Sequence, residues 1–244
     1  MAFAERFRIA TDTEKTEAVA RLVKSSTGDF DFYLFAVLGI SMATFGLILD
    51  SPEIIIGSML IAPVLYPLLS LSLSLTLADL PLMYRSTRTL SISFAVSVLI
   101  SFLIALIANS FFNMPENGQV LARTEPSLVY FLVAVVSGFA ATYAMVHANL
   151  NEMLPGVAIS VSLVPPLGVV GIGLATMQWG IAAGALVLFF VNVVGIAFAS
   201  LVAFSLMDLH STRKIADSAI RQEEKRLEKE AQKIEEIKQE NNVT

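Results

Sequence analysis

The sequence contains no cysteine and only two histidines, His147 and His210. Without cysteine there is no disulfide framework, no thiolate metal site and no cysteine nucleophile, and two histidines are too few for a histidine cluster. The chain also carries no glycine-rich phosphate loop, no spacing of metal ligands and no nucleophile motif. The residues therefore argue against an enzyme, and they indicate neither a metal site nor a cofactor.

Charged residues are scarce as well. They make up 15% of the 244 residues, whereas hydrophobic residues make up 55% and the mean hydropathy is +0.72. This composition lies far outside the range of soluble globular proteins and indicates an integral membrane protein. No basic surface with interleaved aromatic residues is present, so nucleic acid is not an expected partner.

Six apolar segments are long enough to cross a bilayer as helices, which takes about 20 residues each. We expect them near residues 33–50, 53–76, 87–112, 127–147, 153–175 and 180–207. None carries an Asp, Glu, Lys, Arg or His at the depth of the membrane midplane, which disfavours a pump driven by an intramembrane carboxylate. Selective chemistry would have to come from hydroxyls, amides and exposed backbone carbonyls.

The second and fifth segments share a pattern of glutamate, glycine and proline. A shift of 99 positions aligns them without gaps, and extending the shift outward aligns the flanking segments too. It pairs Glu53 with Glu152, Gly57 with Gly156, Pro67 with Pro166 and Ser93 with Asn192. We interpret this register as an internal repeat; the alternative is chance matching between segments rich in Leu, Ala and Val.

Lysine and arginine near the segment ends predict the orientation in the membrane. With a cytoplasmic amino terminus, the outer side carries only Arg123, and the inner side carries Arg21, Lys24, Arg85, Arg88, Arg213 and Lys214. Both termini are therefore expected in the cytoplasm. Because each repeat holds three crossings, an odd number, the second copy is expected upside down relative to the first.

These observations predict an all-α integral membrane protein. Six transmembrane helices would form two inverted three-helix repeats, with an N-terminal amphipathic helix and a charged C-terminal helix. The expected divisions are a cytoplasmic segment 1–32, repeat 1 at 33–112, an external loop 113–126, repeat 2 at 127–208 and a cytoplasmic tail 209–244.

The two charged ends each leave an alternative open. Thr11 and Glu14 have capping-box spacing, and the apolar face behind them would lie on the membrane surface or pack under the bundle; a solvated leader helix is the alternative. That face consists of Ala18, Val19, Leu22 and Val23. In the tail, Ile220, Leu227 and Ile234 recur every seven residues, which leaves a coiled coil and a plain solvated helix as the two readings.

The proline breaks are the strongest candidates for a site. Proline removes a backbone donor, so each break frees carbonyl oxygens inside the membrane. We predict a substrate or ion path made by Pro63, Pro67, Pro165 and Pro166, with Ser93, Ser97 and Asn192 lining it. The alternatives are structural kinks, hydroxyls that bond back to their own helix, and an asparagine that joins two helices.

Three further groups carry weaker predictions. Gly57, Gly156 and Gly195 would permit close helix packing, as would the small residues Ser70, Ser72 and Ser74. Glu53 and Glu152 would cap their helices or attract cations at the two entrances. Arg85 and Arg88 would meet lipid head groups.

Two stretches carry a resemblance to a known family: SMLIAPVLYPLL, and LPGVAISVSLVPPLGVVGIGLAT with the Asn-x-x-Gly of Asn192 and Gly195. Over residues 33–207 the chain resembles the bacterial and archaeal membrane proteins described as domain of unknown function 389. The resemblance implies a prokaryotic inner-membrane protein and brings no activity with it.

We therefore predict a channel or transporter for a small solute or ion in the cytoplasmic membrane of a prokaryote. Its expected partners are membrane lipids, the transported species and further copies of the same chain. The alternatives are a non-transporting membrane scaffold that recruits partners through the charged tail, and a lipid-binding protein.

Overall fold

The computed structural model describes residues 11–25, 27–111, 117–147, 149–150, 154, 156, 162–207, 218, 220–223, 225–229 and 232–233. Every regular element in these ranges is a helix, and none is a strand. The described residues thus confirm an all-helical fold.

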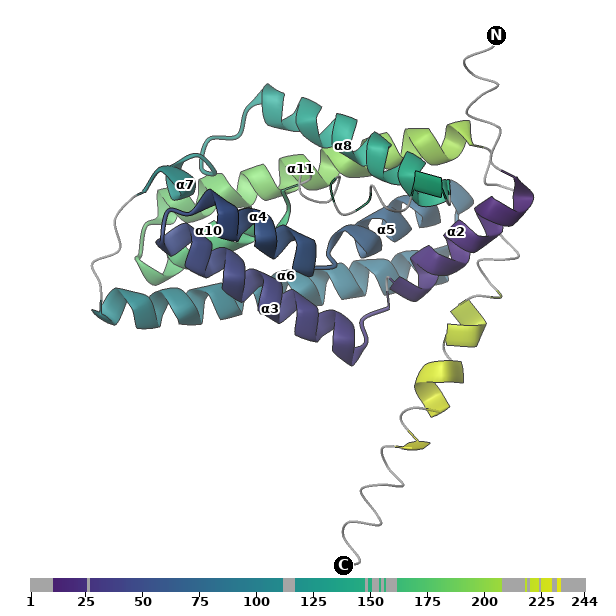
Figure 1. The fold of residues 1–244 in the computed structure, drawn as a ribbon, viewed down its shortest axis with the longest axis horizontal. Coiled ribbons are helices and arrows are strands. Elements are labelled where there is room, and N and C mark those ends of the chain that lie inside the picture. The colour runs from purple at the N-terminus through teal and green to yellow at the C-terminus, as the bar shows by residue number, and fades with distance from the viewer. Residues whose placement is uncertain are drawn as a thin grey trace, which may run out of the picture.

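The first half of the chain contains α2 (Asp12–Ser25), α3 (Phe30–Ile48), α4 (Pro52–Ile61), α5 (Leu65–Leu77) and α6 (Leu80–Phe111). The second half contains α7 (Gly118–Leu121), α8 (Leu128–Val146), α10 (Val164–Ala175) and α11 (Trp179–Leu206). In Figure 1 the long helices lie side by side, with α2 at one end of the bundle and α7 at the other.

Four of these helices, α3, α6, α8 and α11, are long and apolar enough to cross a membrane. α4 and α5 meet the same criterion as a pair, and their axes differ by 53° at the break between them. α10 is apolar but has only 12 residues. The apolar helices identify a membrane protein, in which a spanning segment needs about 20 residues.

The local structure repeats with the 99-residue offset found in the sequence. α5 begins at Leu65 and α10 at Val164, while α6 begins at Leu80 and α11 at Trp179. The helix ends match too, because Ala78 (φ 51°) and Met177 (φ 58°) are both left-handed caps. Such caps favour glycine, so a residue with a side chain at both of these positions is unusual.

Hydrogen bonds around these caps repeat as well. The amide of Asp79 donates to the Ser74 carbonyl at 2.9 Å, and the amide of Gln178 donates to the Gly173 carbonyl at 2.8 Å. These bonds close the last turn of each helix in a Schellman motif. The two halves also pack on each other, since α5 contacts α11 as well as α6, and α10 contacts α6 as well as α11.

Corresponding helices of the two halves start at opposite ends of the bundle (Figure 1). α6 starts at the α2 end, where Arg85 donates to the Thr27 hydroxyl at 2.8 Å. α11 starts near the α7 end, where a Cβ added at Gly184 would meet the Thr124 carbonyl oxygen. α6 and α11 therefore run in opposite directions along the bundle.

The α2 helix packs under the bundle rather than standing in solvent. Thr11 and Glu14 form the predicted capping box, with the Thr11 amide 2.9 Å from a Glu14 carboxylate oxygen. The hydrogen bonds from Thr11 hold the pKa of Glu14 below its ordinary value. The whole predicted apolar face is at most 2% exposed, and α2 contacts α5 and α8. Of the three placements that the sequence left open, the structure adopts the one packed under the bundle.

Asp79 offers a test of how α6 begins. Its carboxylate accepts a hydrogen bond from the Leu82 amide at 2.9 Å, and its side chain is buried. We expect Asp79→Ala to cost about 1 kcal/mol of stability, because an N-cap acceptor is lost. The melting temperature in detergent should fall by about 2–4 °C. Asp79→Asn keeps a cap acceptor, so its melting temperature should fall less. Equal losses for both variants would contradict the capping role.

Candidate functional site: a cavity at a broken helix

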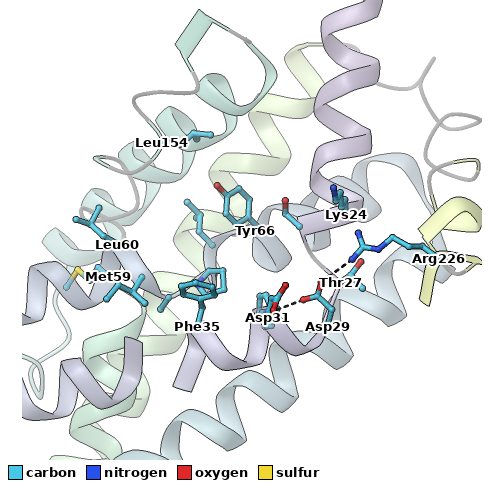
Figure 2. Close-up of a pocket in the computed structure, with 16 residues that line it drawn as sticks. Lys24, Thr27, Asp29, Asp31, Phe35, Met59, Leu60, Tyr66, Leu154 and Arg226 are labelled. Carbon is cyan, nitrogen blue, oxygen red and sulfur yellow. Dashed lines mark hydrogen bonds and ion pairs between the residues drawn. The ribbon is translucent and has the colours of Figure 1, made fainter. Parts of the chain in front are cut away.

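A cavity of about 590 Å³ lies where α4 gives way to α5 (Figure 2). Its walls come from both sides of the break, from the first turns of α3, from the end of α2, and from Leu154 and Arg226 in the second half of the chain. The volume lies within the roughly 300–1,000 Å³ of typical small-molecule sites. The cavity is therefore large enough for a small solute.

Pro63 causes the break. α4 ends at Ile61, Ala62 adopts an extended backbone, and helix resumes at Leu65. Because proline has no amide hydrogen, Pro63 cannot bond the carbonyl of Met59 one turn earlier. Met59 and Pro63 both line the cavity. Pro67 lies in the first turn of α5, where a missing donor disturbs little.

Gly39 of α3 packs directly against the break between α4 and α5. A Cβ added there would fall 2.6 Å from the Ala62 Cβ and 3.1 Å from the Ala62 backbone nitrogen. Only glycine lets α3 approach the chain this closely at the point where α4 ends. The position of the break is thus fixed by a backbone contact as well as by proline.

The mouth of the cavity carries charges of both signs. Lys24 and Arg226 face Asp29 and Asp31 across it (Figure 2). Asp29 accepts a hydrogen bond from the Phe32 amide at 2.9 Å, which caps α3, and pairs with Arg226 at 3.6 Å. Apolar side chains such as Phe35 and Leu60, both about half exposed, form other parts of its wall. The cavity therefore combines charged and apolar walls beside the break.

A side chain binds the segment that leads into α10. Pro165 and Pro166 occupy the first turn of α10, where a missing amide hydrogen disturbs little, as at Pro67. The Asn192 side-chain amide donates to the Ser162 carbonyl, just before the helix, at 3.2 Å. Asn192 is only 4% exposed and comes from α11. The asparagine therefore joins α11 to the segment that leads into α10.

The hydroxyls predicted to line a path are buried on one face of α6. Ser93 and Ser97 are at most 2% exposed, and Ser93 donates back to the Thr89 carbonyl at 2.8 Å. Ser101, two turns after Ser93, donates to the Gly168 carbonyl of α10 at 2.7 Å. Among the predicted path residues, Pro63 alone lines the cavity. The lining role of the others stays a prediction.

The family model for the domain of unknown function (DUF389) matches residues 59–198, more than half of the chain. The chain belongs to this family. It is also 30% identical over 202 residues to the uncharacterized protein MJ0678 of Methanocaldococcus jannaschii, an alignment that covers 82% of this chain and 58% of that protein. No solved structure matches the chain.

The DUF389 match includes both proline pairs and Asn192, while α2, α3 and Arg226 lie outside it. The cavity therefore combines a wall from the family's shared region with a mouth from flanking segments. The charged residues at the mouth of the cavity were not predicted from the sequence. Asp29 before the apolar α3 carries an N-cap signal, but nothing in the sequence connects it to Arg226.

The three predicted packing glycines differ in their surroundings. A Cβ at Gly195 would meet the Ala134 Cβ at 2.8 Å, and one at Gly57 would meet only the Met42 methyl group at 2.8 Å. A Cβ at Gly156 meets no described atom within 4 Å. Ser70, Ser72 and Ser74 are all buried, and Ser70 accepts a hydrogen bond from Ser86 of α6 at 3.0 Å.

The remaining predicted residues that the structure describes lie at the bundle ends. Glu53 is exposed in the first turn of α4 and accepts a hydrogen bond from the Ser51 hydroxyl at 2.8 Å. Its repeat mate Glu152 lies outside the described residues. Arg85 and Arg88 both line a second cavity, of about 450 Å³, at the α2 end.

Proposed function

We propose that this DUF389 protein is a channel or transporter for a small solute or ion. The observation that carries the proposal is the break at Pro63, which opens onto a 590 Å³ cavity with a charged mouth. Transport proteins commonly place their sites where discontinuous helices expose backbone within the membrane. Here the carbonyl of Met59 would serve as such a backbone ligand.

The proposal includes six crossings arranged as two inverted repeats. It takes the bent α4–α5 pair as the second crossing and the stretch through α10 as the fifth. Three observations support this arrangement: the matched left-handed caps, the contacts of α5 with α11 and of α10 with α6, and the opposite directions of corresponding helices. Proteins of this construction alternate access by moving one repeat against the other.

The proposed setting is a prokaryotic cytoplasmic membrane with both termini inside. The distribution of basic residues supports this orientation, because Lys24, Arg85 and Arg88 lie at the α2 end and Arg123 follows α7 at the opposite end. Assembly with further copies of the chain stays a prediction.

A flux assay tests the proposal. The protein is reconstituted in liposomes loaded with a panel of monovalent ions, divalent ions and small zwitterions. Leu60, a half-exposed wall residue of the cavity, is replaced by Trp to fill the space. We expect flux of the transported species to fall about tenfold, equivalent to about 1.4 kcal/mol.

The matched control is Ile56→Trp. Ile56 lies one turn earlier on the same face of α4, is 44% exposed and does not line the cavity. This variant should keep wild-type flux. Wild-type liposomes that pass no member of the panel, or equal flux in both tryptophan variants, would count against the cavity as the path.

The scaffold alternative assigns the recruiting role to the charged tail. The described part of that tail is already engaged by its own chain, since Ile220 is 6% exposed in the main core and Arg226 pairs with Asp29. Of the two functions, transport is therefore the better supported.

A further inference from the structure

The second cavity lies at the α2 end of the bundle, between the start of α6 and the C-terminal segment. Arg85 and Arg88 come from successive turns of α6, and Tyr33 and Tyr84 add aromatic rings with hydroxyl groups. Ile220 and Leu227, two members of the seven-residue pattern in the tail, form an apolar wall. The cavity thus combines two guanidinium groups, two phenols and an apolar side.

Arg85 is held in place by the short hydrogen bond to the Thr27 hydroxyl. Arg88 is exposed, as is Tyr84 at 72%. A guanidinium group presents several N–H donors in a plane, which matches the oxygens of a phosphate, and tyrosine is typical of the membrane–water interface. The chemistry of the cavity therefore suits a phosphate group at the membrane surface.

An exposed apolar stripe leads away from this cavity along α6. Ile92, Leu99, Leu103 and Leu106 follow Arg88 at helical spacing, and all four are exposed. Only 22% of the most apolar stretch of α6 is buried inside the protein, against 44% of the corresponding stretch in each of the other three long helices. A molecule with a phosphate at Arg88 could therefore lay an acyl chain along this stripe.

We propose that this cavity binds the head group of an anionic phospholipid, with Arg85 and Arg88 contacting the phosphate and the acyl chains lying along α6. Basic pockets between helices on the cytoplasmic side of a membrane suit such head groups. The apolar stripe favours a lipid over free phosphate, because only the lipid fills both parts. The site does not depend on the transport proposal.

Competition between lipids in the intact protein tests this site. Full-length protein in detergent is mixed with equal amounts of phosphatidylglycerol and phosphatidylcholine of identical chains, and the retained lipid is counted by native mass spectrometry. We expect about tenfold preference for phosphatidylglycerol, and its loss in the Arg85→Gln, Arg88→Gln double variant. Arg21→Gln, a change on α2 outside the cavity, should keep the preference.

Several outcomes would overturn the proposal. Equal retention of the two lipids by the wild-type protein would overturn it. An undiminished preference for phosphatidylglycerol in the double variant would also overturn it. Inorganic phosphate that displaces phosphatidylglycerol at millimolar concentration would assign the cavity to a soluble anion instead. If the double variant does not fold, Arg88→Lys keeps the charge without the planar fork and should weaken the preference.

Discussion

Asn192→Leu is expected to destabilise the protein by about 1–3 kcal/mol, because it leaves the part-buried Ser162 carbonyl without a donor. Pro166 has no amide hydrogen to take over the bond. Leucine has the same branching and the same number of side-chain heavy atoms as asparagine, so the change removes the donor without opening a cavity. For a chain of this size the melting temperature in detergent should fall by roughly 2–4 °C per kcal/mol.

Ser93→Ala is the matched control for this prediction. Ser93 is the repeat mate of Asn192 and is just as buried, but its hydroxyl bonds to its own helix at Thr89. Helix carbonyls already accept a backbone bond, so losing this hydroxyl should cost little. A melting temperature for Asn192→Leu close to that of Ser93→Ala would show that the Asn192 bond does not stabilise the segment at Ser162 that leads into α10.

The comparison of Pro63 with Pro67 shows how far sequence reasoning reaches. Both prolines lack an amide hydrogen, and the sequence predicted a break from that local rule. The structure confirms a break between α4 and α5, but it is centred on residues 62–64, and Pro67 is accommodated inside α5. Which proline interrupts the helix depends on where the helix restarts, and that is set by tertiary packing.

The hydroxyl row on α6 makes the same point about the site. Thr89, Ser93, Ser97 and Ser101 follow one another at intervals of four, a spacing that places them on one helix face, and all four are buried. The spacing could not say what that face meets. Ser101 bonds α10 through Gly168, whereas Ser93 bonds its own helix. Partners far apart in the chain decide between lining a path and holding a bundle together.

Gly39→Ala is expected to destabilise the protein by about 1–3 kcal/mol, although alanine is the better helix former. The added Cβ would lie 2.6 Å from the Ala62 Cβ and 3.1 Å from the Ala62 Cα, so backbone must move. Because Ala62 lines the cavity, the movement should also alter flux in the liposome assay. Stability and flux are expected to fall together.

Gly57→Ala on the neighbouring helix α4 should have the opposite sign. Its Cβ would meet only the Met42 methyl group, the far end of a flexible side chain that can turn away. The gain in helix propensity, about 0.5–1 kcal/mol, should then remain, and the melting temperature should hold or rise. If both alanine variants shift the melting temperature in the same direction, the contact of Gly39 with Ala62 does not fix the break. A fall in melting temperature for Gly39→Ala with a rise for Gly57→Ala would show two separate effects in one pair of packed helices: the cost of a close backbone contact and the gain in helix propensity.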